Sequence, residues 1–116
     1  MPAADASLTV PYPYDGPDAL RAGIFQALDR VVDPELALSI VDVGLVYGVA
    51  VTPDRLHVRM TMTSAACPVA DVILDAAEDA LDAVAPPGME IALELVWEPA
   101  WTPGRLSRAA RVFMGW

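Results

Sequence analysis

The sequence predicts one α/β domain of the α+β two-layer type, in which helices pack on one face of a small three-stranded sheet. The 116 residues match the length of one domain, and a hydrophobic content of 55% supplies a core. Alternating apolar and polar residues predict strands, and apolar residues at helical spacing predict helices. In the order α-β-β-α-β-α, the expected elements are a helix over 18–32, strands over 40–51 and 56–63, a helix over 68–84, a strand over 90–97 and a helix over 104–113.

Residues 1–17 are expected to form a flexible, proline-rich tail that precedes the domain at 18–116. Prolines cannot donate backbone hydrogen bonds, which disfavours regular structure in this segment. An extended segment lying on the domain surface is the alternative, because Tyr12 and Tyr14 alternate with prolines. The first helix follows, and it is expected to end before Pro34, whose ring disfavours helical geometry at the preceding residue.

The strands over 40–51 and 56–63 are expected to pair as a hairpin, because a turn sequence, Thr52-Pro53-Asp54, separates them. In the first strand, Gly48 and Ala50 share one face, and such small residues indicate close approach by another element. The second strand alternates cleanly. Its apolar side is Leu56, Val58, Met60 and Met62, and its polar side is His57, Arg59, Thr61 and Thr63.

The helix over 68–84 shows the clearest separation of an apolar stripe from a charged face, which is typical of a helix lying on a core. Beyond it, Trp97 is expected to fill the core. Trp101 is expected to lie exposed, where a tryptophan can anchor a partner protein. The charged face of the helix consists of carboxylates: Asp71, Asp75, Glu78, Asp79 and Asp82.

Charge and composition argue against several classes of protein. The net charge of −9 repels phosphate backbones, so nucleic-acid binding is not expected. The single cysteine cannot form an intramolecular disulfide. The sequence given shows no secretory signal pattern and no apolar run long enough for a membrane span. We therefore expect a cytoplasmic protein that does not associate with membranes.

Cys67 is the residue most suited to chemistry. It precedes Pro68, and because proline is favoured at the first position of a helix, Cys67 is expected at or beside the N-cap. Free N–H groups and the helix dipole favour a thiolate there, the form that binds metal or attacks an electrophile. A buried, unreactive cysteine is the alternative. The hydroxyls of Thr63 and Ser64 could hydrogen-bond a thiolate or sulfide, or could belong to ordinary turn residues.

One cysteine per chain limits the metal site that can form. Iron–sulfur clusters commonly take four cysteine ligands, and structural zinc takes four protein ligands, for which only His57 adds a conventional candidate. Because His57 lies beside a turn, we interpret it as a surface residue. A labile site shared between chains is the metal hypothesis that remains. Asp33 and Glu35 flank Pro34 in a rigid turn, but this motif alone has no visible partner for acid–base catalysis.

The chain carries four motifs in a fixed order: VVDPE at 31–35, IVDVGLVY at 40–47, MTMTSAACP at 60–68 and VWEPAWTP at 96–103. Together they closely resemble the metal–sulfur cluster assembly factor family, over residues 18–112. This family includes SufT-like iron–sulfur maturation proteins, the cytosolic iron–sulfur targeting factors of eukaryotes and a subunit of bacterial phenylacetate degradation. Two departures stand out: Ala65-Ala66 occupies a place where members often carry Pro-Gly, and the C-terminal cysteines of the phenylacetate-pathway members are missing.

The resemblance implies a compact, often dimeric α/β domain that helps deliver iron–sulfur clusters to apo-proteins and is not itself an enzyme. It implies that Cys67 is the functional cysteine and the metal ligand, with Asp33 and Glu35 beside it. The expected cofactor is a transient iron–sulfur cluster shared between chains, with none held stably by the monomer. The expected partners are client apo-proteins, the assembly machinery and a second copy of the chain in a homodimer.

Two other functions stay open on the sequence. The chain could be a non-catalytic adaptor subunit of a multi-protein complex, such as an oxygenase or a maturation complex, in which Cys67 is only structural. It could also be a thiol enzyme with Cys67 as the nucleophile, although the sequence offers no visible base close to that residue.

Overall fold

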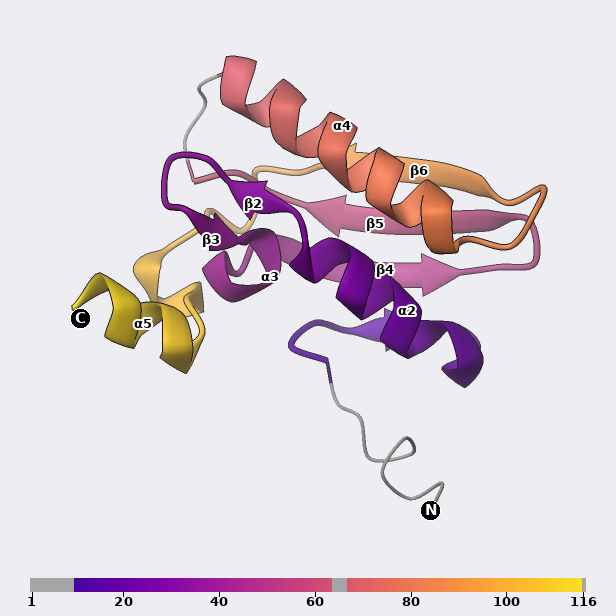
Figure 1. Ribbon diagram of the computed structural model, residues 1–116, viewed down its shortest axis with the longest axis horizontal. Helices are drawn as coiled ribbons and strands as arrows, with labels where there is room; N and C mark the ends of the chain where they lie inside the picture. The colour runs from indigo at the N-terminus through magenta and orange to yellow at the C-terminus, as the bar shows by residue number, and fades with distance from the viewer. Residues whose placement is uncertain (1–9, 64–66, 116) are drawn as a thin grey trace.

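The structure is a computed structural model that describes residues 10–63 and 67–115, with the backbone alone described at Cys67 and Pro68 (Figure 1). Within these residues a four-stranded sheet has the strand order β1-β4-β5-β6. The β4–β5 pair is antiparallel, whereas β1 pairs with β4 and β5 with β6 in parallel. The strands are β1 (Tyr14–Asp15), β4 (Val46–Val51), β5 (Arg55–Met60) and β6 (Glu90–Leu95).

A smaller antiparallel pair and four helices complete the described part of the chain. The pair joins β2 to β3 and lies at the end of the sheet where β5 terminates (Figure 1). None of the helices described is long and apolar enough to cross a lipid bilayer. The remaining elements are β2 (Val32–Asp33), β3 (Leu38–Ser39), α2 (Asp18–Asp29), α3 (Ile40–Val43), α4 (Cys67–Val84), a 3₁₀ turn (Pro103–Arg105) and α5 (Arg108–Met114).

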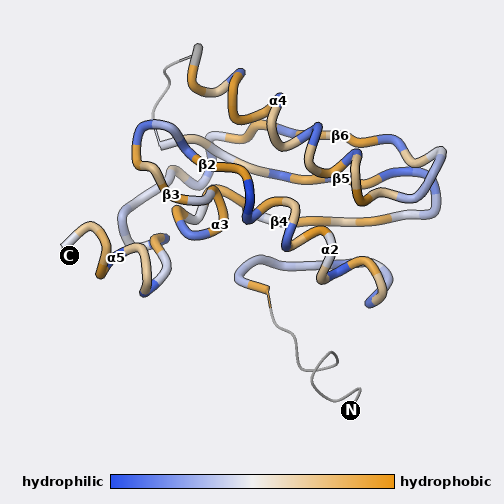
Figure 2. Tube along the Cα trace, in the orientation of Figure 1, coloured by the Kyte–Doolittle hydropathy of each residue, from blue (hydrophilic) through white to orange (hydrophobic). Residues whose placement is uncertain are grey.

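Helices α2 and α4 lie side by side over one face of the sheet, and the hydrophobic core fills the space between the two layers (Figure 1). The core side of α4 is built from buried residues at three- and four-residue spacing, Ala70, Ile73, Ala77 and Leu81. Figure 2 shows the result as hydrophobic and hydrophilic stretches that alternate along this helix. The predicted α/β class, with helices on one face of the sheet, is therefore confirmed.

The sheet contains one more strand than the three predicted, because Tyr14–Asp15 pairs with β4. The expectation of a flexible tail over 1–17 is wrong for this segment, since Tyr12 is buried in the core and the Val49 N–H donates to the Pro13 carbonyl. Proline is tolerated here because its carbonyl can still accept a bond at the edge of a sheet. Residues 1–9 of the predicted tail lie outside the described residues.

The predicted strand over 40–51 divides into two elements. Ile40–Val43 forms one turn of helix, α3, because the Ser39 hydroxyl accepts from the Asp42 N–H as an N-cap. Gly44 ends that turn with a φ of 84°, and a side chain there would collide with the backbone of Arg105. Only the second half of the apolar run, Val46–Val51, is therefore a strand.

The predicted roles of the two tryptophans are reversed. Trp97 is 47% exposed at the end of β6. Trp101 is half-buried against the core, and its indole Nε1 donates to the Val43 carbonyl at 2.7 Å. The hydrogen bond explains the burial, because an indole N–H can enter a core when it finds an acceptor.

Candidate functional site

Helix α4 starts at Cys67, so the cysteine occupies the N-terminal end of an 18-residue helix, as the sequence predicts. Backbone N–H groups in this first turn have no acceptor within the helix, and the helix dipole places partial positive charge there. Both effects favour a thiolate over a thiol. The backbone of Cys67 therefore lies at the end of α4 where negative charge is favoured.

The segment that leads into this helix leaves the sheet from the end of β5. Thr61 is fully buried and its N–H donates to the Leu45 carbonyl at 2.8 Å, which ties the exit of β5 to the residue before β4. Its hydroxyl has no hydrogen-bond partner among the described residues. Thr63 is half-buried in a bend. Ser64, whose hydroxyl was also predicted to bond a thiolate or sulfide, lies outside the described residues.

Asp33 and Glu35 lie in the turn that joins β2 to β3, and they have different surroundings. Asp33 is only 1% exposed, and its Oδ1 accepts from the Glu35 N–H at 2.8 Å. Its carbonyl accepts from the Ala37 N–H at 2.8 Å, so both its side chain and its backbone hold the turn. Asp33 is therefore a structural residue of the turn, whereas Glu35 has an exposed side chain available to a ligand.

The β2–β3 pair packs against α4, and it lies at the end of the sheet where α4 begins (Figure 1). The motif that contains Asp33 and Glu35 is therefore on the same side of the molecule as the start of the Cys67 helix. Thr63 belongs to the connection between β5 and that helix. That Glu35 and Cys67 belong to one site stays a prediction of the family resemblance, because more than thirty residues separate them in the sequence.

The last motif, 96–103, meets the 40–47 motif at this same end of the sheet. In addition to the Trp101 bond to Val43, the Ser107 N–H donates to the Asp42 carbonyl at 2.7 Å. The Arg105 Nε donates to the Gly44 carbonyl at 3.0 Å. These bonds hold the C-terminal segment beside α3, so the last motif and the 40–47 motif meet in the fold.

The described residues contain no group of three or more His, Cys, Asp or Glu side chains that could hold a metal ion. The chain has a single cysteine, and a cluster commonly needs four thiolate ligands. Of the predicted site residues, Cys67 lies at the start of α4 and Glu35 carries an exposed side chain.

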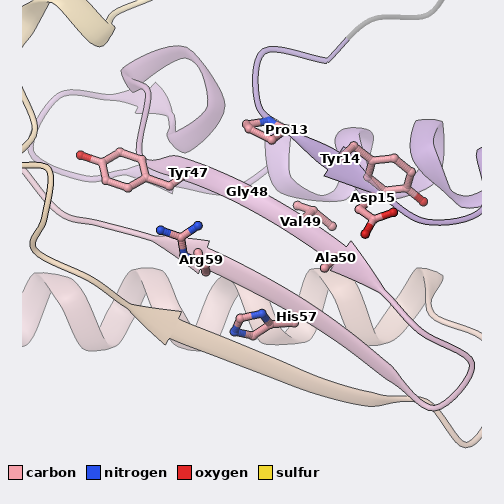
Figure 3. Close-up of a pocket in the computed structure, with 9 residues that line it drawn as sticks. All are labelled: Pro13, Tyr14, Asp15, Tyr47, Gly48, Val49, Ala50, His57 and Arg59. Atoms are coloured by element: carbon pink, nitrogen blue, oxygen red, sulfur yellow. The ribbon is translucent and has the colours of Figure 1, made fainter.

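A pocket lies on the opposite, uncovered face of the sheet. Figure 3 shows this pocket, which has a volume of about 220 Å³. Sequence reasoning placed His57 and Arg59 on one side of a strand but assigned them no function. A usable signal was present, because basic residues at alternate positions of one strand are unusual in so acidic a chain. The lining residues are Pro13, Tyr14, Asp15, Tyr47, Gly48, Val49, Ala50, His57 and Arg59.

Comparison with known proteins identifies the family. Residues 21–92 match the family described as iron–sulfur cluster assembly protein. The chain belongs to the iron–sulfur cluster assembly protein family. The resemblance drawn from the four motifs is thereby confirmed, and the family match spans both the Asp33–Glu35 turn and the Cys67 helix start.

Individual proteins similar to this chain support the same family assignment. The chain is 43% identical over 99 residues to the Bacillus subtilis Fe-S protein maturation auxiliary factor YitW. This match covers 84% of this chain and 96% of that protein. It is 40% identical over 86 residues to the Staphylococcus aureus Fe-S protein maturation auxiliary factor SufT, covering 73% and 97%. The crystal structure of a domain of unknown function from Bacillus anthracis superposes with a TM-score of 0.77 at 36% identity, covering 84% and 93%.

Proposed function

We propose that this chain assists the maturation of iron–sulfur proteins in the cytosol, and that Cys67 acts as a transient thiolate ligand of the iron–sulfur unit being transferred. The observation that carries the proposal is the position of Cys67 at the start of α4, within a chain related over most of its length to maturation auxiliary factors. The cluster is cargo in this proposal, since one cysteine cannot hold it alone.

The remaining ligands would come from a second copy of the chain, a small thiol or the client protein. Sharing ligands in this way makes the cluster labile, because a thiolate of the client can replace one donor at a time. Homodimers supply two Cys67 thiolates, which is half of a common ligand set. Clients and the assembly machinery are therefore the partners that the proposal requires.

The other residues of the proposed site would help Cys67 to bind the iron–sulfur cluster. Glu35 is exposed at the turn and could bind an iron ion before or after sulfide joins it, because carboxylates are hard oxygen donors. Asp33 would keep that turn rigid through its bond to the Glu35 N–H. The hydroxyls of Thr63 and Ser64 would donate to sulfide or to the Cys67 thiolate. No step in this scheme makes or breaks a covalent bond of a small substrate, so we propose a carrier role and not an enzymatic one.

Maturation of client enzymes in cells tests this function. In a strain that lacks the gene, we would measure the activity and iron content of cluster-dependent enzymes after complementation with wild type, Cys67→Ala, Glu35→Gln or the control Glu78→Gln. Glu78 is an exposed carboxylate of α4 outside the proposed site. Wild type and Glu78→Gln should restore maturation, and Cys67→Ala should not. Full restoration by Cys67→Ala, at equal protein level, would refute the ligand role.

A non-catalytic adaptor is the second candidate, because apolar side chains are exposed near the C-terminal end of the chain. Val112 and Phe113 of α5 are 74% and 65% exposed. Exposed aromatic residues are common anchors of protein interfaces. Partners that bind the Cys67→Ser variant as well as wild type, but lose affinity for Phe113→Ala, would favour the adaptor over the carrier.

A further inference from the structure

The uncovered face of the sheet carries three basic side chains along β5, in an otherwise acidic protein. Two of them are paired with the neighbouring strand β6. Arg55 contacts Glu90 at 3.1 Å, and His57 Nε2 contacts Glu94 Oε1 at 2.9 Å. Both pairs are partly exposed, and each places a carboxylate of β6 against a side-chain nitrogen of β5.

Arg59, the third of these basic residues, has no ion-pair partner among the residues that the structure describes. The register of the sheet places it directly opposite Glu94. One oxygen of the Glu94 carboxylate, however, lies 2.9 Å from His57 Nε2. The guanidinium of Arg59 is therefore an exposed cation, and the acidic residue opposite it in the register contacts His57.

The pocket beside Arg59 has an apolar floor and one aromatic wall. Gly48 and Ala50 form the floor because they lie opposite Arg59 and His57 in the β4–β5 register. Tyr47 forms the wall at the end of the pocket toward which the Arg59 side chain extends (Figure 3). The guanidinium of Arg105 lies over the Tyr47 ring, 4.1 Å from its centroid, which adds positive charge behind this wall.

The one carboxylate that lines the pocket, Asp15, belongs to the opposite end. It lies in register with Ala50 on the edge strand β1, whereas Arg59 lies in register with Gly48. Figure 3 shows Asp15 on the far side of Ala50 from Tyr47. The charged groups of the pocket are therefore separated along its length, with positive charge at the Tyr47 end and negative charge at the β1 end.

We propose that this pocket receives a single glutamate or aspartate side chain of a partner protein, with Arg59 as its counter-ion. An arginine pairs well with a carboxylate because its planar guanidinium offers two parallel N–H donors. The aliphatic part of the incoming residue would lie on Gly48 and Ala50, which leave room above the sheet. The inference concerns a different face from Cys67 and does not depend on the cluster-carrier function.

The size and charge of the pocket favour one acidic side chain over a small molecule or a nucleic acid. The volume of about 220 Å³ is below the roughly 300–1,000 Å³ of most small-molecule and cofactor sites, and suits one side chain. Nucleic acid is disfavoured by the net charge of −9. A second copy that placed its acidic α4 face on this pocket would make a head-to-tail contact and not a two-fold dimer, so Arg59-dependent self-association is the outcome that identifies this occupant.

Nuclear magnetic resonance titration of the full chain tests the proposal. The probe is a five-residue blocked peptide with one central glutamate, beside its glutamine counterpart and free glutarate. The glutamate peptide should shift the amides of Gly48, Ala50 and Arg59 saturably at low salt, and the glutamine peptide should not. Arg59→Gln should weaken binding about tenfold or more, because a charge-assisted hydrogen bond is lost.

Arg55→Gln is the matched control, since it removes the same charge from the same strand at a residue already paired with Glu90. It should change the affinity less than about twofold if binding is local. Equal weakening by both variants would reduce the effect to general electrostatics and overturn the proposal. Glutarate binding as tightly as the peptide, Arg59-dependent self-association, or no saturable shift with the glutamate peptide would also overturn it.

Discussion

The two faces of the sheet differ sharply although they are made from the same strands. On β5, the alternate residues Leu56, Val58 and Met60 are fully buried beneath α2 and α4. The residues between them, His57 and Arg59, face the uncovered side with charged or titratable groups. One strand therefore supplies both the core of the fold and a surface for recognition.

The difference separates the two tasks of the molecule. The covered face fixes the geometry of the sheet, and so fixes where the segment after β5 delivers Cys67 to the start of α4. The side chains of His57 and Arg59 on the uncovered face can change without disturbing that geometry, because His57 is half-buried and Arg59 is exposed. We expect substitutions on the first face to unfold the protein and substitutions on the second face to alter binding.

The largest effect is expected from two neighbouring residues of α4. Ile73 is 1% exposed and Val72 is 57% exposed. Ile73→Ala should lower the free energy of unfolding by about 2–5 kcal/mol, since it leaves a cavity in the core. Val72→Ala should change it by less than about 0.5 kcal/mol. Urea denaturation measures both. Equal losses would mean that the covered face is not the core.

Alkaline pH should destabilise the protein through Tyr12 of the core. Burial raises the pKa of Tyr12, the Tyr14 phenol raises it further, and Arg21 partly opposes both. The neutral phenol is thus favoured in the folded state, so its contribution is complete below the unfolded pKa of about 10 and is lost as pH rises above it.

Each pH unit in that range should cost up to about 1.4 kcal/mol of stability. We would measure urea unfolding between about pH 8 and pH 11.5, around that unfolded pKa, for wild type and Tyr12→Phe. The variant should lose less stability on the alkaline side. An identical decline for both proteins would show that Tyr12 does not control it.

Removal of a tyrosine hydroxyl should have opposite signs on the two sides of the sheet. Tyr12 Oη is buried with no hydrogen-bond partner among the described residues, so Tyr12→Phe should stabilise the protein at neutral pH by roughly 1 kcal/mol. Tyr47 Oη donates to the Pro99 carbonyl, so Tyr47→Phe should destabilise it by roughly 1 kcal/mol. Thermal unfolding of both variants measures the difference, and the same sign for both would contradict this account.

The smallest effects are expected from the exposed charges of β5. Arg55→Gln breaks the exposed pair with Glu90 and should cost less than about 1 kcal/mol, with a smaller difference at high salt. Arg59→Gln should be closer to zero because no described residue pairs with it. A loss above about 2 kcal/mol for Arg59→Gln would show a structural role on the uncovered face.

Long, regular patterns predicted the architecture well. The stripe of α4 and the alternation of β5 are period signals sustained over several turns or residues, and helix and strand form where they predict. The strand ends at Met60 and not at 63, and Thr61, expected on its polar side, is fully buried. Ile40–Val43 was misassigned because three apolar residues around Asp42 fit a strand and a helical turn equally. The Ser39 cap and the left-handed Gly44 decide between them.

Features that depend on distant contacts could not be predicted from the sequence. Trp101 is half-buried because its N–H reaches the Val43 carbonyl, 58 residues away in sequence. Tyr12 is buried although it lies between prolines, because the segment around it pairs with β4. For the site, the four motifs indicated Cys67, Asp33 and Glu35 through a family resemblance, while the division between structural Asp33 and exposed Glu35 required the fold.

Anaerobic reconstitution with iron and sulfide tests the central claim, that Cys67 is a ligand, most directly. We would measure the iron and sulfide bound per chain, the visible absorption and the native mass, for wild type beside Cys67→Ala. We predict that wild type takes up iron and sulfide as a dimer that shares a cluster, and that Cys67→Ala takes up neither. Equal uptake by both proteins, or no uptake by wild type, would contradict the account.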